Sequence, residues 1–211
     1  MMRRPPRATL FPYTTLFRSE VRKDGSRVKI LVSRTHPDLV RRLFELEVPE
    51  IADDIIEIKR VVREPGYRTK MAVVSTDPKI DGIGACVGVR GSRIKAVIDE
   101  LRGERIDIIR WSDSLETLIM NGLKPAVIHI DNIYPDEAAH SATVLVDEDE
   151  QSLAIGKRGQ NVRLASRLCG WEINIKTREE YFGKEDSTAP EAPAEKEEAA
   201  PEEATDRKSV V

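Results

Sequence analysis

Residues 81–109 read DGIGACVGVRGSRIKAVIDELRGERIDII, and this stretch decides the fold that we predict for the chain. A short apolar run at residues 83–87 is followed by the glycine loop GVRG at residues 88–91. Residues 92–101 then place apolar side chains at the 3.6-residue spacing of an amphipathic helix, and the isoleucines of residues 106–109 predict a strand. The stretch therefore predicts a short helix, a glycine loop, a longer helix and a strand, in that order.

Upstream of this stretch, the sequence adds one helix and two strands. The helix begins at Pro37, where proline suits the first turn, and stops before Pro49. Its apolar face holds Leu39, Val40, Leu43, Phe44 and Leu46. Apolar segments at residues 56–61 and 71–74 predict two strands, which are joined by a turn at residues 64–66.

The same order of elements returns in the second half of the chain. Its glycine loop is GKRG at residues 156–159, within the segment SLAIGKRGQNVRLASRLCGW at residues 152–171. The other elements expected of this copy are helices at residues 115–123, 149–155 and 160–168, and strands around residues 127–130, 144–146 and 171–175. Two copies of one unit, each a small sheet packed on helices, predict an α+β fold class.

The two glycine loops have the chemistry of phosphate-binding sites. Glycine has no Cβ atom to hold a phosphate away from the main chain, and the start of the following helix favours an anion. Arginine and lysine side chains add charge-assisted hydrogen bonds to phosphate oxygens. The candidate binding residues are Gly88, Val89, Arg90, Gly91, Ser92 and Arg93 in the first copy, and Gly156, Lys157, Arg158, Gly159, Gln160, Asn161 and Arg163 in the second. One such loop fits a plain helix–helix turn equally well, but its repetition in a matching position favours binding.

Charge is distributed unevenly along the chain. The formal net charge is −3, but residues 184–211 hold nine acidic and four basic residues, which leaves the remainder weakly positive. Contact with nucleic acid must therefore depend on the local placement of Arg and Lys, and not on a global field. Residues 181–211 are expected to form an acidic disordered tail, because they are poor in large apolar groups.

The N-terminal end differs from the rest of the chain. Residues 1–19 show neither a helical nor a strand period and nothing pairs with them, so we expect a segment that is foreign to the native gene or disordered. A natural basic arm is the alternative, and residues 206–211 are interpreted in the same way. Residues 20–33 are expected to form one strand after a turn at Asp24-Gly25. A lone strand is unstable, so we expect it either to pair with a segment that is absent from the chain or to pack on the next domain.

The sequence gives no support for a catalytic site, a metal site or a cofactor. Cys86 and Cys169 lie in apolar surroundings without a CxxC pairing, which is typical of buried free thiols, and the three histidines lack metal-binding spacing. The glycines around residues 82–88 do not fit a dinucleotide loop, because the third comes one residue late. No apolar run is long enough to span a bilayer and no signal peptide is evident, so a cytoplasmic protein is expected.

Four segments carry a resemblance to a known family: LFELEVPEI (residues 43–51), REPGYRTKMAV (residues 63–73) and the two glycine-loop segments quoted above. They resemble the NusA family of bacterial transcription factors over about residues 20–180. The glycine loops are similar to the GxxG loops of KH domains, which clamp about four nucleotides of single strand. The resemblance implies two tandem type II (prokaryotic) KH domains, at residues 35–112 and 113–180. It also implies that residues 20–34 are a remnant strand of an OB-type RNA-binding domain with its linker. Val89 departs from the family, which commonly has proline there.

The resemblance also implies a function and partners. These are binding of nascent single-stranded RNA beside RNA polymerase, effects on transcription elongation, pausing, termination and antitermination, and contact with other antitermination factors. The polymerase-binding N-terminal domain of the family is expected to be absent from this chain. We expect a monomer with no membrane contact and no enzymatic activity. A ribosome-associated structural KH protein is the alternative, and a module that binds only proteins is a third possibility.

Overall fold

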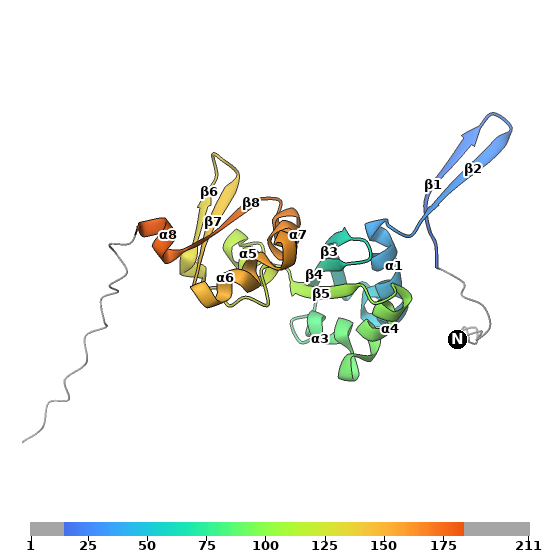
Figure 1. Ribbon diagram of the computed structural model, residues 1–211. Coiled ribbons are helices and arrows are strands. Elements are labelled where there is room, and N and C mark those ends of the chain that lie inside the picture. Colours follow the sequence, from blue (N-terminus) through green and yellow to red (C-terminus); the bar gives the residue numbers. More distant parts are fainter. Residues whose placement is uncertain (1–14, 184–211) are drawn as a thin grey trace, which may run out of the picture.

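The computed structural model describes residues 15–183. Two domains follow each other along the chain, and an N-terminal hairpin extends away from them (Figure 1). Two sequence predictions lie outside the described residues. These are the foreign segment as far as residue 14 and the acidic tail from residue 184 onward.

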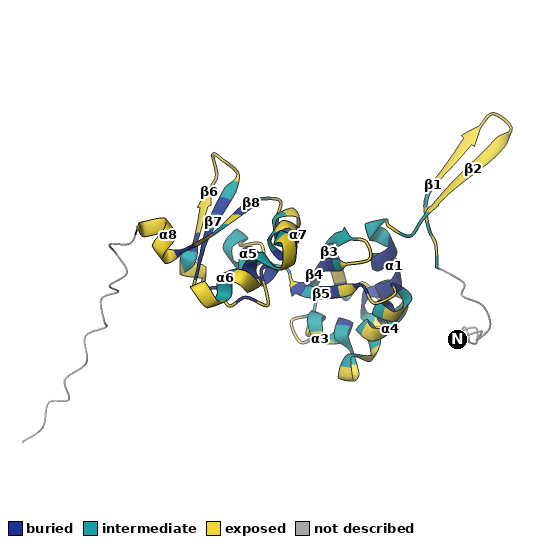
Figure 2. Ribbon diagram, viewed as in Figure 1, coloured by how far each residue is buried: buried dark blue, intermediate teal, exposed yellow. Residues whose placement is uncertain are grey.

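The N-terminal hairpin consists of two antiparallel strands, β1 (Phe17–Asp24) and β2 (Arg27–Ser33). The turn at Asp24-Gly25 was predicted, but the prediction of a single strand is wrong, because β1 pairs with β2 along its whole length. For the same reason, the expectation that nothing pairs with residues 1–19 is wrong for Phe17 and Arg18. The large apolar side chains of the hairpin stay exposed (Figure 2), among them Val21, Val28, Ile30, Leu31 and Val32.

The first domain follows the predicted order of helix, two strands, short helix, glycine loop, helix and strand. Its elements are α1 (Pro37–Glu47), α2 (Pro49–Ala52), β3 (Ile56–Glu64), β4 (Arg68–Ser75), α3 (Gly82–Val87), the 3-10 turn η1 (Val89–Gly91), α4 (Ser92–Glu100) and β5 (Arg105–Arg110). The sheet order is β3-β4-β5, with β3 antiparallel to β4 and β4 parallel to β5. The one-turn helix α2 is an addition to the predicted order.

One face of this sheet packs on α1, α3 and α4. Leu39, Val40, Leu43 and Phe44 of α1 are buried there, as their helical spacing predicts. Leu46 was predicted for the same face but is 70% exposed. It lines an open hollow between the last turn of α1 and α4. The helical period therefore predicts which way a side chain points, but not whether another element covers it.

The second domain repeats the order of the first. Its elements are α5 (Leu115–Gly122), η2 (Ile130–Asn132), β6 (Ile133–Asp136), β7 (Ser141–Val146), α6 (Glu148–Ile155), η3 (Lys157–Gly159), α7 (Gln160–Cys169), β8 (Glu172–Thr177) and α8 (Arg178–Phe182). The sheet order is β6-β7-β8, again with one antiparallel and one parallel pair. Helix α8 occupies the start of the predicted tail, and a capping box between Thr177 and Glu180 stabilises its first turn.

The first strand of the second domain lies later in the chain than predicted. Residues 127–129 form no strand, and β6 begins only at Ile133. The apolar run that suggested the strand is misleading, since Val127 is 66% exposed and Ile130 is 47% exposed. Pro135 weakens the strand signal of the true segment, yet β6 is an edge strand, where proline is tolerated.

The second domain packs on the sheet face that α1, α3 and α4 leave open. Helix α7 contacts β3 and β4, and in Figure 1 it lies between the two domains. Leu168 of α7 is fully buried against Ala72 and Ile109 of the first sheet, with Val62 and Trp111 packed at the margin. The two domains therefore share a small apolar core.

Polar contacts extend this shared core. The Lys70 ammonium, which is fully buried, donates to the main-chain oxygen of Lys124 at 3.3 Å and lies 3.2 Å from an Asp107 carboxylate oxygen. Burial lowers the pKa of Lys70, and the nearby Asp107 charge opposes that shift. The Asn121 side chain also donates across the boundary to the main-chain oxygen of Arg110.

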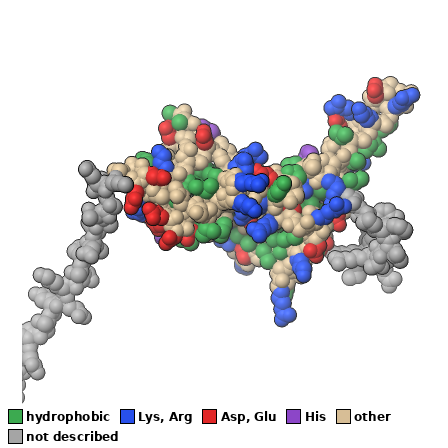
Figure 3. Space-filling model, in the orientation of Figure 1, with side chains coloured by type: hydrophobic (Ala, Val, Ile, Leu, Met, Phe, Trp, Pro, Cys, Tyr) green, Lys and Arg blue, Asp and Glu red, His purple; other side chains and the backbone are tan. Residues whose placement is uncertain are grey.

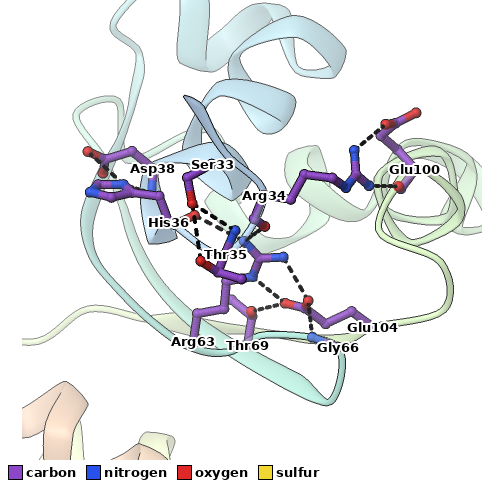
Figure 4. Close-up of polar contacts among 10 residues, drawn as sticks. All are labelled: Ser33, Arg34, Thr35, His36, Asp38, Arg63, Gly66, Thr69, Glu100 and Glu104. Atoms are coloured by element: carbon purple, nitrogen blue, oxygen red, sulfur yellow. Dashed lines mark hydrogen bonds and ion pairs between the residues drawn. The ribbon is translucent and has the colours of Figure 1, made fainter. Parts of the chain in front are cut away.

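A buried ion pair fastens the segment before α1 to the first domain. The Arg63 guanidinium donates to both carboxylate oxygens of Glu104, at 2.8 and 2.9 Å (Figure 4). The exposed fractions of these two side chains are 4% and 0%. The same guanidinium donates to the main-chain oxygens of Arg34 and His36, so it links the chain entering α1 with the start of β5.

Candidate nucleic-acid interface

The two GxxG loops have nearly the same backbone conformation. In the first loop, φ and ψ are 75° and 173° at Gly88, 53° and 28° at Arg90, and 75° and 16° at Gly91. The corresponding values in the second loop are 74° and 172° at Gly156, 57° and 30° at Arg158, and 69° and 18° at Gly159. The sequence repeat is therefore a repeat in backbone geometry, including an arginine in the left-handed region in each copy.

Both loops lie on the surface with their central side chains in solvent. Val89 is 82% exposed, and Arg90, Lys157 and Arg158 are exposed as well. Within residues 15–183, these three cations have no salt-bridge partner. Figure 3 shows basic side chains gathered over the middle of the visible face and acidic ones near α8. Free cations on exposed loops suit the binding of an anionic chain.

Each loop opens directly into a helix whose start lacks a side-chain cap. Helices α4 and α7 have Gly91 and Gly159 as N-cap residues, and neither start has a side-chain hydrogen bond. The amides of these two glycines are used within the loops, where they donate to the oxygens of Gly88 and Gly156. Uncapped first turns and the positive end of the helix dipole favour a phosphate near the loops.

Two of the predicted contact residues instead support the loops from behind. Arg93 donates to the main-chain oxygen of Ala85 at 2.6 Å and pairs with Glu50 at 2.9 Å. Its equivalent in the second loop, Asn161, is fully buried and donates to the main-chain oxygens of Leu123, Leu153 and Ala154. Both side chains therefore hold carbonyl groups of the helix that precedes the loop.

The Arg93–Glu50 pair also affects the pKa of the Glu50 carboxyl group. A hydrogen bond from the Glu50 main-chain N–H, followed by that from Arg93, lowers the pKa of Glu50. Glu50 therefore stays ionised at neutral pH and keeps the Arg93 charge occupied. No sequence signal identified this partner, because it lies in α2, far from the loop in sequence.

Two further predicted residues contact the first domain. The Gln160 side-chain amide donates to Glu64 at 2.8 Å, and the Arg163 guanidinium pairs with the same carboxylate at 3.0 Å. Arg163 also donates to the main-chain oxygen of Arg158 inside the second loop. Glu64, at the end of β3, was not foreseen as part of the site.

The structure thus divides the predicted residues into two groups. One group lies on the loop surface: Gly88, Val89, Arg90, Gly91, Ser92, Gly156, Lys157, Arg158 and Gly159. The other group is engaged in contacts within the protein: Arg93, Gln160, Asn161 and Arg163. We expect direct contact with a ligand from the first group.

The first glycine of the second loop should be the least replaceable residue of that loop. A Cβ atom on Gly156 would lie 2.7 Å from Asn161 Cβ and 3.0 Å from its main-chain nitrogen, whereas a Cβ on Gly159 meets nothing within 4 Å. Both glycines have positive φ, but Gly159 has ψ 18°, in the left-handed helical region, whereas Gly156 has ψ 172°, a conformation that is almost restricted to glycine, so backbone strain and the close contact both disfavour alanine at Gly156. We expect a loss of roughly 1–2 kcal/mol for Gly159→Ala and of at least about 3 kcal/mol for Gly156→Ala. Urea unfolding measures the free energy of unfolding of both variants, and equal losses would contradict the close contact between Gly156 and Asn161.

The structure also bears on thiol reactivity, metal binding and membrane insertion. Burial raises the pKa of the Cys86 and Cys169 thiols to about 12, which keeps both groups protonated at neutral pH. Among residues 15–183, no group of three His, Cys, Asp or Glu side chains is placed to hold a metal ion. None of the helices described is long and apolar enough to cross a membrane.

Comparisons with known proteins agree with this geometry. Residues 34–111 match the description of the NusA-like first KH domain, and residues 115–182 match that of the NusA-like second KH domain. The transcription termination/antitermination protein NusA of Rickettsia prowazekii is 50% identical over 162 residues, which are 76% of this chain and 32% of that protein. NusA of Bacillus subtilis is 46% identical over 159 residues, which are 75% of this chain and 42% of that protein.

The chain therefore spans 32% to 42% of the length of these curated relatives. The matched segment contains both loops, both sheets and the contact between the domains. Over this segment the chain belongs to the NusA family and carries its two tandem KH domains, as the loop motifs predicted.

Proposed function

We propose that the chain binds single-stranded RNA through both GxxG loops, as part of the control of transcription elongation, pausing, termination and antitermination. The observation that carries this proposal is the repeated loop conformation with free cations at its tip. Arg90 and Arg158 both adopt positive φ, which costs energy for a side chain with a Cβ atom. Strain of this kind persists where the surrounding structure enforces it, often at binding sites.

The second loop should contribute more to RNA affinity than the first. It offers Lys157 and Arg158, whereas the first offers Arg90 beside the neutral Val89. Arg93 and Arg163 are each paired with a glutamate, so they add little net charge at either loop. Phosphate contacts to exposed cations dominate non-specific affinity, and the difference in free cations supports this ranking.

Salt dependence tests the phosphate contacts. If the three free cations each neutralise one phosphate, the logarithm of the association constant should fall against the logarithm of salt concentration with a slope of about −2, given about −0.7 per single-strand contact. Changing Lys157 and Arg158 to serine should reduce the slope by about 1.4. Fluorescence anisotropy with a labelled unstructured RNA gives both slopes. Affinity that does not change with salt would favour a module that binds only proteins.

RNA polymerase and other antitermination factors are the partners that we propose for a longer protein carrying this segment, and we propose that the segment itself is monomeric. The names of the relatives, which are transcription termination/antitermination proteins, support the proposed partners. The competing function is a structural KH protein of the ribosome. The two functions can be distinguished by purifying a longer protein that also carries the polymerase-binding domain of the family, and identifying what copurifies with it. Polymerase without ribosomes is expected, and ribosomes without polymerase would favour the alternative.

A further inference from the structure

Charged side chains on the outward face of β3 contact both ends of helix α7. Arg60, Val62 and Glu64 alternate along this strand and face the second domain, where Val62 packs near Leu168. Glu64 contacts the first turn of α7, whereas Arg60 donates to the main-chain oxygen of Leu168 near the last turn, at 2.6 Å. The strand therefore places a negative group at the start of the helix and a positive group at its end.

This arrangement complements the electrostatics of the helix. A helix carries partial positive charge at its start and partial negative charge at its end, so both contacts are favourable. The spacing also fits, because four residues of strand and eight residues of helix each extend roughly 12–13 Å. The Arg60 guanidinium is further held over the Trp111 ring at 5.7 Å, which fixes the second contact in place.

The Glu64 contact reaches the backbone of the second loop. Arg163 pairs with Glu64 through Nε at 3.0 Å and donates through Nη2 to the main-chain oxygen of Arg158 at 3.3 Å. Gln160, the other partner of Glu64, directly follows the last glycine of this loop. A carboxylate of the first domain is thus connected to the loop of the second domain through two side chains.

We propose that Glu64 is a positioning residue, which holds the second GxxG loop in a fixed relation to the first domain so that one RNA strand reaches both loops. The proposal rests on the proposed function and deepens it. Glu64 does not contact the RNA itself, and it acts through Gln160 and Arg163. Its effect therefore falls on RNA that spans the two loops, because only such RNA depends on their relative placement.

Charge reversal at Glu64 separates positioning from simple electrostatics. Glu64→Lys makes the surface more positive, so an electrostatic effect alone would strengthen the binding of every RNA. If Glu64 positions the loop, affinity for spanning RNA should instead fall about tenfold while affinity for a four-nucleotide RNA stays unchanged or rises. The spanning length is set with the wild-type chain, as the shortest unstructured RNA that binds more tightly than the four-nucleotide RNA.

Two further variants complete the experiment. Glu57→Lys makes the same change in charge on the same strand. Among residues 15–183 the Glu57 carboxylate pairs only with Lys59, so spanning RNA should bind this variant at least as tightly as wild type. Adding Arg163→Glu to Glu64→Lys restores an ion pair between the domains with reversed charges. Since a glutamate at position 163 cannot donate to the main-chain oxygen of Arg158, this double variant should recover part of the spanning affinity.

The outcomes separate the positioning role from the proposed function. If the wild-type chain binds neither RNA, the proposed function fails. If it binds both but Glu64→Lys binds spanning RNA as tightly as wild type or more tightly, the positioning role fails and RNA binding stands. Loss of both RNA lengths in Glu64→Lys, or no recovery in the double variant, would also overturn the positioning role.

Discussion

Aspartate in place of both Lys157 and Arg158 should weaken the binding of single-stranded RNA by about 10²- to 10⁴-fold. Each charge-assisted hydrogen bond to phosphate contributes roughly 1.5–3 kcal/mol, and the aspartates add repulsion to the loss of two such bonds. The fold should survive because both side chains are exposed. Position 158 has φ 57°, a conformation that aspartate tolerates better than most residues.

A matched control is available at the other end of α4. Arg102 is an exposed arginine with φ 60°, close to the φ of 57° at Arg158, and Arg105 is exposed close by in the sequence. Changing both to aspartate therefore makes the same change in charge, with one of the two positions also matched in backbone conformation. This control should bind RNA much more tightly than the variant of the second loop, because neither arginine belongs to a GxxG loop and salt weakens charge interactions over distance. The pair Val89→Asp and Arg90→Asp should weaken binding as well, but less than the change in the second loop. Equal affinity of wild type and both loop variants would show that the loops are not the RNA site.

The largest effect on stability is expected at Glu104. The Glu104 carboxylate accepts hydrogen bonds from Arg63, from the Thr69 hydroxyl at 2.6 Å and from the Gly66 amide at 2.8 Å. Glu104→Ala leaves the Arg63 guanidinium buried without its counter-ion, which typically costs about 3–5 kcal/mol. That is a large part of the roughly 5–15 kcal/mol that stabilises a domain. Chemical unfolding should show the loss, while Glu57→Ala on the surface should change stability by less than about 0.5 kcal/mol.

Acid should reduce this difference between wild type and Glu104→Ala. Burial raises the pKa of Glu104, but the hydrogen bonds from Arg63, Thr69 and Gly66 outweigh it and hold that pKa below the ordinary value of 4.5. A carboxyl group with a lowered folded-state pKa adds stability above pH 4.5, and this contribution is lost as pH falls through the folded-state pKa. Unfolding measured from pH 7 to pH 3 should therefore bring the two proteins closer together. A difference that stays constant with pH would show that the ion pair is not the source of stability.

The repeated elements of the fold could be predicted because each depends on local signals. The loops at residues 88–91 and 156–159 adopt one conformation because glycine stands wherever the backbone needs positive φ, apart from a single arginine in each. The apolar spacing of α4 and α7 likewise predicted which faces pack. The prediction of a strand at residues 127–130 was wrong because these residues are apolar although Val127 is exposed. Pro135 weakens the sequence signal of the strand that the structure has, β6.

The contacts of the candidate site residues could be predicted only in part, because partners that are distant in the sequence leave no local signal. Arg93 and Arg163 follow their loops as phosphate-binding arginines would, and only the structure shows Glu50 and Glu64 beside them. Asn161 looks like a surface residue at the start of a helix, yet the approach of α5 and α6 buries it completely. Composition and spacing report what a residue can do, whereas burial and partners decide what it does.

The most direct test of the account is a nuclear magnetic resonance titration of the chain with an unstructured RNA long enough to span both domains. If the two loops hold one RNA strand together, the amide resonances of Val89–Ser92 and Lys157–Gln160 shift along the same titration curve, while those of β1 and α8 stay in place. Shifts that are confined to other surfaces, with both loops unmoved at saturation, would contradict the assignment of RNA binding to the GxxG loops.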